Sequence, residues 1–396
     1  MRRRFVSFIP TLDQMLSSAT APLFLLIAFM ILTTKTFALT AQFIFLYGCL
    51  ASICQAILGE PYLIAVKQKS RIIDPAVYTS ASILLAVLVS IASFPLSLLI
   101  TDSLKLSIVL ILPSLAMLIQ DSQRIWRISN RSWSFLLCSD ASWLLASVTS
   151  LLLVKQSDNY FLFFAWGVPG CIALLIILDY GDFRSINLLK GWDLLIHFTR
   201  RYYYTVVETT LSGVSLVIAY WAISNYLGDS EISLLRYASL FFGLSTIIIN
   251  RQRIFDFASE QIEQLEVTTN LNTLRRIKEI WRVVILNLIF LFVFFALLDL
   301  SGVGSQFSFP GVFILLVLAL DRLSVGLLMA VTVFYKTHKS PKVIAKIRTL
   351  VALSSSSIYA LFAILDSKLE LLIILGTLPY VVAFGLIYRS INKATN

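Results

Sequence analysis

The chain has 396 residues, of which 58% are hydrophobic and only 14% charged, and its mean hydropathy is +0.86. This small number of polar residues cannot cover the surface of a soluble globule. The composition therefore predicts an integral membrane protein. The net charge of +10 does not indicate a nucleic-acid partner, because the basic residues follow a membrane topology.

Long apolar runs recur along the whole chain. They do not alternate strictly between apolar and polar residues, so they predict helices rather than a transmembrane barrel. A helix of about 20 apolar residues spans the hydrocarbon core of a bilayer. We therefore predict an all-α protein of about twelve transmembrane helices, near residues 12–34, 38–66, 76–100, 104–124, 133–154, 158–179, 202–223, 231–250, 282–300, 307–334, 347–364 and 369–388.

The basic residues fall on one side of this topology. Clusters such as residues 2–4 and 275–282 lie there, whereas the opposite connections hold little beyond Lys35, Lys105, Lys155 and Lys368. Cytoplasmic loops of membrane proteins are enriched in Lys and Arg in this way. We therefore expect both termini to be cytoplasmic and the basic clusters to meet anionic membrane lipids.

The chain divides into two halves with the same plan. Residues 1–179 form a predicted N-terminal six-helix bundle and residues 202–396 a C-terminal one, joined by an amphipathic helix at the cytoplasmic surface within residues 180–201. An ungapped shift of 195 positions pairs Asp13 with Glu208, which suggests an internal duplication. Transporters are often built from such repeats, with the pathway between the halves.

Polar residues line one face of the eighth predicted helix, near 231–250. Their spacings of three and four place them along a single side. They are Arg236, Ser239, Gly243, Thr246 and Asn250. Close packing against another helix explains a stripe of Ser and Gly equally well, since small residues line membrane interfaces.

Charged residues also occur inside predicted helices, where each costs roughly 2.5 to 3.5 kcal/mol and usually faces a cavity or a partner. Asp140 lies in the fifth helix, and Asp321 and Arg322 lie in the tenth. A buried ion pair that serves only the fold is an alternative for these charges. Asp13 and Glu208 begin the first helix of each half, where the helix dipole alone favours a carboxylate.

The sequence contains no recognisable catalytic constellation. It has no glycine-rich phosphate loop, and its four cysteines and two histidines lack the spacing of a metal site. We therefore predict a protein that is not an enzyme and has no metal or cofactor. A membrane glycan polymerase or ligase remains an alternative, although the short noncytoplasmic loops argue against it.

Four short stretches resemble one known family. They are LDQMLSS (residues 12–18), ILGEPYLIAV (57–66), QDSQRIWRISNRSWSFLLCSDASW (120–143) and YLGDSEISLLRYAS (226–239). The chain is similar here to the polysaccharide-exporter (Wzx-like) branch of the multidrug/oligosaccharidyl-lipid/polysaccharide (MOP) flippase superfamily. It departs from that pattern at Ala21-Pro22 and at Phe37-Ala38.

This resemblance implies a function and roles for particular residues. A member would move a polyprenyl-diphosphate-linked oligosaccharide from the cytoplasmic to the outer leaflet of a bacterial inner membrane, with glycan polymerase machinery as a further candidate partner. Arg236 and Arg322 would hold the diphosphate, and Arg124 would lie at the cytoplasmic mouth. Further lining residues would be Ser239, Thr246 and Asn250, and the carboxylates that shape the cavity or couple an ion would be Asp13, Asp140, Glu208 and Asp321.

Other classes of protein fit the same pattern. A cation-coupled exporter of drugs or other small molecules would share the fold, because a fold does not fix a function. A noncatalytic scaffold for glycan assembly would share the topology, but it would not need Arg236.

Overall fold

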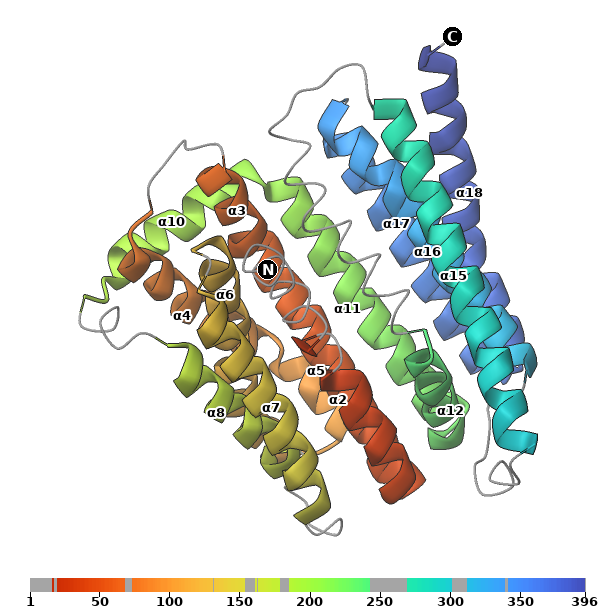
Figure 1. Cartoon of the computed structure of the whole chain (residues 1–396), viewed down its shortest axis with the longest axis horizontal. Helices are drawn as coiled ribbons and strands as arrows, with labels where there is room; N and C mark the ends of the chain where they lie inside the picture. Colours follow the sequence, from red (N-terminus) through yellow and green to blue (C-terminus); the bar gives the residue numbers. More distant parts are fainter. Residues whose placement is uncertain are drawn as a thin grey trace, which may run out of the picture. The chain divides into compact units, whose positions relative to one another are not determined.

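The computed structural model is built from helices (Figure 1). It describes residues 16–17, 20–67, 73–130, 132–153, 161, 163–178, 185–242, 269–300, 312–338 and 341–395. Within these ranges every regular element is helical. Seven of the described helices are long and apolar enough to cross a membrane: Thr34–Val66, Pro75–Ala92, Leu104–Ser129, Trp133–Leu153, Tyr203–Tyr226, Lys342–Ile364 and Leu369–Arg389. Thr20–Ile31 and Phe163–Ile177 are shorter apolar helices. The prediction of an all-α, multi-span membrane protein is confirmed.

The chain forms two compact units, residues 1–217 and 218–396. The helices from the first unit up to the boundary are α2 (Thr34–Cys54), η1 (Gln55–Gly59), α3 (Glu60–Lys67), α4 (Pro75–Ala92), α5 (Phe94–Thr101), α6 (Leu104–Ser129), α7 (Trp133–Leu153), η2 (Phe163–Gly167), α8 (Val168–Ile177), α10 (Leu188–Arg201) and α11 (Tyr203–Tyr226). Those that follow are α12 (Asp229–Leu240), α15 (Thr269–Leu300), α16 (Val312–His338), α17 (Pro341–Ile364) and α18 (Leu369–Thr395). The boundary lies inside α11, and the predicted division at residues 180–201 stays a prediction.

The predicted helix at 76–100 is in fact two helices. The first, α4, begins at an Asp74 cap, whose carboxylate accepts a hydrogen bond from the Ala76 backbone N–H at 3.0 Å. It ends at Ala92, and α5 begins at Phe94 with Pro95 in its first turn. Proline has no backbone N–H and its ring collides with the carbonyl four residues earlier, so Pro95 disfavours a continuous helix and is well tolerated in the first turn of a new one.

Three other predicted boundaries differ from the structure. The fourth predicted helix ended at Arg124, but α6 continues to Ser129 and so carries the polar stretch from Gln120 onward. The ninth was predicted to begin at residue 282, but α15 already begins at Thr269. The eighth is confirmed only as α12, which ends at Leu240. Residues 243–250, and with them Thr246 and Asn250, lie outside the described part of the chain.

Residues 188–201 of the predicted amphipathic connector form α10, which packs against α4. Gly191 allows this contact. A Cβ atom at this position would lie 2.8 Å from the Ala81 backbone nitrogen and 2.9 Å from the Ser80 carbonyl carbon. The Asn187 backbone N–H also donates to Ser80 Oγ at 3.0 Å, so the start of α10 is tied to α4. The rotation of α10 about its own axis is thereby fixed.

We expect Gly191→Ala to lower the free energy of unfolding by about 1–3 kcal/mol, because backbone atoms rather than a flexible side chain must move. Thermal unfolding in detergent measures the change. Gly48→Ala in α2 is the matched control, since no atom lies within 4 Å of its added Cβ. Alanine favours a helix over glycine by about 1 kcal/mol, so the control should be neutral or stabilised. Equal unfolding temperatures for the two variants would contradict the close contact.

Candidate functional site

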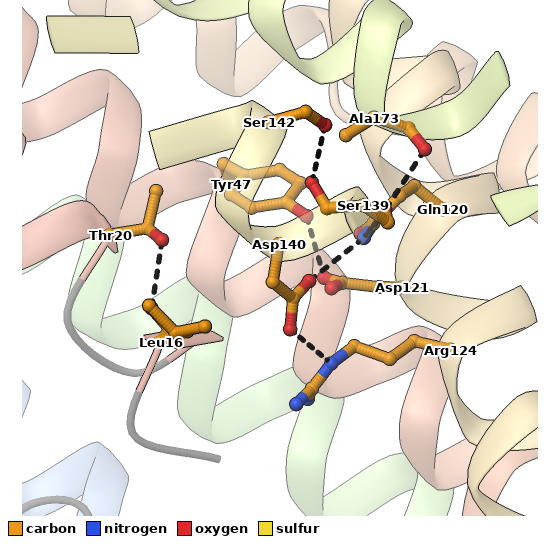
Figure 2. A network of polar contacts seen from close by, with 10 residues as sticks. All are labelled: Leu16, Thr20, Tyr47, Gln120, Asp121, Arg124, Ser139, Asp140, Ser142 and Ala173. Atoms are coloured by element: carbon orange, nitrogen blue, oxygen red, sulfur yellow. Dashed lines mark hydrogen bonds and ion pairs between the residues drawn. The ribbon is translucent and has the colours of Figure 1, made fainter. Parts of the chain in front are cut away.

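A buried polar network lies in the first unit, around α6 (Figure 2). Asp121 and Arg124 are three residues apart in α6, so they share one face of the helix. The Tyr47 hydroxyl of α2 donates a hydrogen bond to Asp121 Oδ2 at 2.6 Å. Arg124 interacts electrostatically with the same carboxylate. Asp121 is therefore held by Tyr47 of α2 and by Arg124 of its own helix.

Arg124 forms its ion pair with Asp140 of α7. The distance from Arg124 Nε to Asp140 Oδ2 is 3.0 Å, and the two side chains are only 12% and 3% exposed. Gln120 Nε2 donates to Asp140 Oδ1 at 3.4 Å and to Ser139 Oγ at 3.2 Å. Ser139 in turn donates to the Ala173 carbonyl of α8 at 2.9 Å. A buried charge is stable only with such partners, so the network ties α6, α7 and α8 together.

A second basic residue of α6, Arg127, binds a backbone carbonyl. Arg127 is 4% exposed, and its Nε and Nη2 donate to the Ile177 carbonyl at 3.1 and 3.0 Å. Its guanidinium carbon lies 4.8 Å from the Trp126 ring centroid and 4.7 Å from that of Phe135. Carbonyls in the last turn of a helix have no partner within the helix. Arg127 therefore caps α8 and is a structural residue.

In the second unit, Arg236 of α12 lies over an aromatic ring. Its guanidinium carbon is 4.0 Å from the centroid of the Tyr220 ring in α11, a close cation–π contact. Ser239, one turn later, donates to the Arg236 carbonyl at 2.8 Å. The hydroxyl of Ser239 thus serves its own helix, whereas the guanidinium of Arg236 is oriented by the neighbouring helix.

Asp321 and Arg322 of α16 are adjacent in sequence and also in space. Arg322 Nε lies 3.8 Å from Asp321 Oδ2, and the side chains are 24% and 14% exposed. The separation is too long for a hydrogen bond. Arg322 Nε has no hydrogen-bond partner among the described residues. The guanidinium is thus only partly satisfied by the neighbouring carboxylate.

Two tyrosines complete a cluster around this pair. Tyr359 of α17 and Tyr380 of α18 both lie within electrostatic range of Asp321 and of Tyr220. Helices α16 and α17 both pack against α18, and α12 packs against α16. We call Tyr220, Arg236, Asp321, Arg322, Tyr359 and Tyr380 the arginine–tyrosine cluster. It holds two guanidinium groups, three phenol hydroxyls and one carboxylate, a set suited to an anion.

A glycine sets the position of Tyr359. A Cβ atom at Gly376 of α18 would lie 2.5 Å from Tyr359 Cζ and 2.9 Å from its hydroxyl oxygen. On the other side, Ser355 Oγ of α17 donates to the Gly376 carbonyl at 2.7 Å. The ring of Tyr359 therefore lies directly on the α18 backbone.

We expect Gly376→Ala to displace the Tyr359 ring and to destabilise the protein by about 1–3 kcal/mol. Gly385→Ala, in the same helix with no atom within 4 Å of the added Cβ, is the control and should not destabilise. Thermal unfolding of the single variants and of Gly376→Ala in a Tyr359→Leu background measures the coupling. If Gly376→Ala destabilises the Tyr359→Leu variant as much as it destabilises the original protein, the contact between Gly376 and the Tyr359 ring is contradicted.

The remaining predicted residues are distributed as follows. Glu208 is 1% exposed in α11. Because α11 begins at Tyr203, Glu208 lies beyond the first turn, where the helix dipole has little effect. The dipole interpretation is therefore weak for Glu208. Asp13, like Thr246 and Asn250, lies outside the described residues.

Sequence reasoning missed several members of both sites. Tyr47 and Gln120 were not singled out, whereas Asp121 was recognised only as the first residue of the Asp-x-x-Arg pattern in the stretch 120–143 that resembles the exporter family. Tyr359 and Tyr380 gave no signal, because their proximity to Asp321 depends on tertiary packing.

The fold is that of the MOP superfamily. Lipid II flippase MurJ in an inward closed conformation aligns with a TM-score of 0.67 at 14% identity, over 98% of this chain and 87% of MurJ. A MATE protein in the straight conformation aligns with a TM-score of 0.65 at 15% identity, over 96% of this chain and 93% of that protein. An inward-facing multidrug resistance MATE family transporter aligns with a TM-score of 0.62 at 12% identity, over 95% of this chain and 93% of that transporter. No protein-family model and no curated protein matches the sequence. The expected superfamily fold is confirmed, while the polysaccharide-exporter branch stays a proposal.

Proposed function

We propose that the protein is a transporter that moves a polyprenyl-diphosphate-linked oligosaccharide from the cytoplasmic to the outer leaflet by alternating access. The observation that carries this proposal is the arginine–tyrosine cluster of the second unit, with Arg236 over Tyr220 and Arg322 beside Asp321. The fold supports it, since a lipid II flippase is among the proteins with this architecture.

The chemistry of the cluster fits a diphosphate. A sugar-diphosphate head cannot enter hydrocarbon without polar partners. Guanidinium groups bind phosphate oxygens through two parallel N–H donors, and stacking on an aromatic ring fixes the plane in which these donors lie. In the cluster Arg236 is oriented in this way by Tyr220. The phenol hydroxyls of Tyr359 and Tyr380 add neutral donors.

The polar network of the first unit is proposed to serve entry and coupling. Positive-inside topology puts the connection between α6 and α7 in the cytoplasm, and Arg124 is close to it. In this proposal Arg124 receives the head group there, while Asp140, Glu208, Asp321 and Asp13 shape the field or carry a coupling ion. Ser239, Thr246 and Asn250 belong to the same lining as Arg236. Both termini would be cytoplasmic.

The setting follows from the substrate. Lipid-linked glycans of this kind are assembled at a cytoplasmic leaflet, so we propose the inner membrane of a bacterium, with anionic lipids as neighbours. Glycan polymerase machinery is the candidate partner, because it would consume the product on the outer side.

A cation-coupled exporter of small molecules is the second candidate. Two buried carboxylates favour this second candidate, because carboxylates inside a membrane often carry coupling ions. The Asp140 side chain is 3% exposed and Glu208 is 1% exposed. Multidrug transporters also share the architecture. Such a protein would respond to an ion gradient and be inhibited by small lipophilic cations.

Gene deletion with labelled sugar tests the proposal. Lipid-linked oligosaccharide should accumulate in the inner leaflet while surface glycan is lost, in a strain without a redundant exporter. An unchanged leaflet distribution would refute the flippase and favour the exporter. Outward-facing lipid-linked units that fail to polymerise would instead indicate a polymerase, a ligase or a scaffold.

A further inference from the structure

Helix α10 presents three different sectors around its axis. Successive residues of an α-helix are about 100° apart. One sector is packed within the first unit and consists of Gly191, Leu194, Leu195 and Phe198, all buried. The remaining circumference of α10 is exposed or half-buried, and it divides into an apolar and a basic sector.

The apolar sector has no cover in the described part of the chain. It consists of Leu188, Leu189, Trp192 and the half-buried Ile196. Leu189 is 79% exposed, and Leu188 and Trp192 are 50% and 44% exposed. A tryptophan beside leucines on an amphipathic helix is typical of the membrane–water interface, where the ring has both apolar and polar neighbours.

The basic sector lies next to the apolar one. It contains Lys190, Arg200 and Arg201, which are exposed, and a single carboxylate, Asp193. Arg201 also lies over the Tyr202 ring, at 5.8 Å from its centroid. Burial raises the pKa of the Tyr202 hydroxyl, while the Arg201 guanidinium opposes that rise. Tyr202 is therefore neutral at physiological pH and does not cancel the basic charge.

The orientation of these two sectors is fixed by the packed one. Gly191 lies so close to Ser80 and Ala81 that even a Cβ atom would collide there, so no other side of α10 can take its place in this contact. Asn187 caps the helix, with its side chain accepting from the Lys190 backbone N–H at 3.0 Å. The exposed apolar residues are therefore held in one direction and are not a loose end of the chain.

We propose that α10 is a docking surface for anionic phospholipid in the cytoplasmic leaflet. The apolar sector would insert at the level of the acyl-chain boundary, and Lys190, Arg200 and Arg201 would contact anionic head groups. The excess of basic over acidic residues in this helix favours an anionic lipid over a zwitterionic one. The surface does not depend on which substrate the protein carries.

Quenching of Trp192 fluorescence by brominated lipid tests this inference. The full-length protein is reconstituted in nanodiscs of phosphatidylcholine that contain a small, equal fraction of brominated phosphatidylglycerol or of brominated phosphatidylcholine. The chain has seven tryptophans, so the difference between the protein and its Trp192→Phe variant isolates Trp192. We expect its fluorescence to be quenched severalfold more strongly by the anionic lipid.

Two variants separate charge from insertion. Arg200→Gln/Arg201→Gln should remove most of the preference for phosphatidylglycerol while Trp192 is still quenched, because each basic residue contributes about a fivefold attraction to an anionic surface. Arg282→Gln, an exposed arginine of α15, is the control and should keep the preference. Equal quenching by both lipids would overturn the anionic specificity. No quenching of Trp192 by either lipid would overturn the docking surface itself.

Discussion

Arg236→Gln/Arg322→Gln is expected to reduce export of lipid-linked oligosaccharide by roughly a hundredfold or more. Hydrogen bonds to a charged group contribute about 1.5–3 kcal/mol each, and this variant removes both guanidinium groups of the arginine–tyrosine cluster. Glutamine removes the charge while it preserves a polar, although shorter, side chain. The measurement is the ratio of inner-leaflet to outer-leaflet lipid-linked oligosaccharide, with surface glycan as the second readout.

Controls separate this loss from misfolding. Arg282→Gln removes an exposed arginine of α15 in the same unit and should leave export unchanged. Tyr220→Phe keeps the ring under Arg236 and should keep most activity, whereas Tyr220→Leu removes the stack and should lose activity. Full export by the properly inserted double variant would refute the role of both arginines, whatever the substrate.

Much of the fold could be predicted from hydropathy alone. The requirement for about 20 apolar residues per span is strong and local, so the helices near 133–154 and 202–223 are confirmed as α7 and α11 with ends shifted by at most three residues. The break at Ser93 was missed because Pro95 lies within an otherwise unbroken apolar run. The continuation of α6 to Ser129 was missed because hydropathy falls where Gln120 begins, although the helix does not end there.

The candidate sites could be predicted only in part. The cost of a charge in the membrane identifies Asp140, Asp321 and Arg322 one at a time, whereas Arg124 was named only through the family resemblance. This cost does not say which charges meet, since the Arg124–Asp140 pair joins two helices. Nor does it distinguish Tyr359 and Tyr380 among the 15 tyrosines of the chain. Contacts of that kind depend on side-chain packing between helices, which leaves no periodic signal in a single sequence.

The Arg124–Asp140 pair should respond unequally to loss of its two partners. Arg124→Leu removes the guanidinium from two carboxylates, Asp140 at 3.0 Å and the neighbouring Asp121. We expect it to cost about 3–5 kcal/mol of unfolding free energy, as for a buried pair that loses one partner. Asp140→Leu should cost less, because Arg124 still has Asp121 in reach and is itself 12% exposed.

The double variant Arg124→Met/Asp140→Leu distinguishes a structural pair from a functional one. Replacing both charges by apolar side chains of similar volume is often close to neutral, and Asp121 keeps its 2.6 Å hydrogen bond from Tyr47. We therefore expect the double variant to unfold at a higher temperature than Arg124→Leu, yet to fail in export. Thermal unfolding in detergent and leaflet analysis in cells measure the two effects. A stable double variant that still exports would limit the pair to holding α6 against α7, and the arginine–tyrosine cluster would then bear the anion-binding role alone.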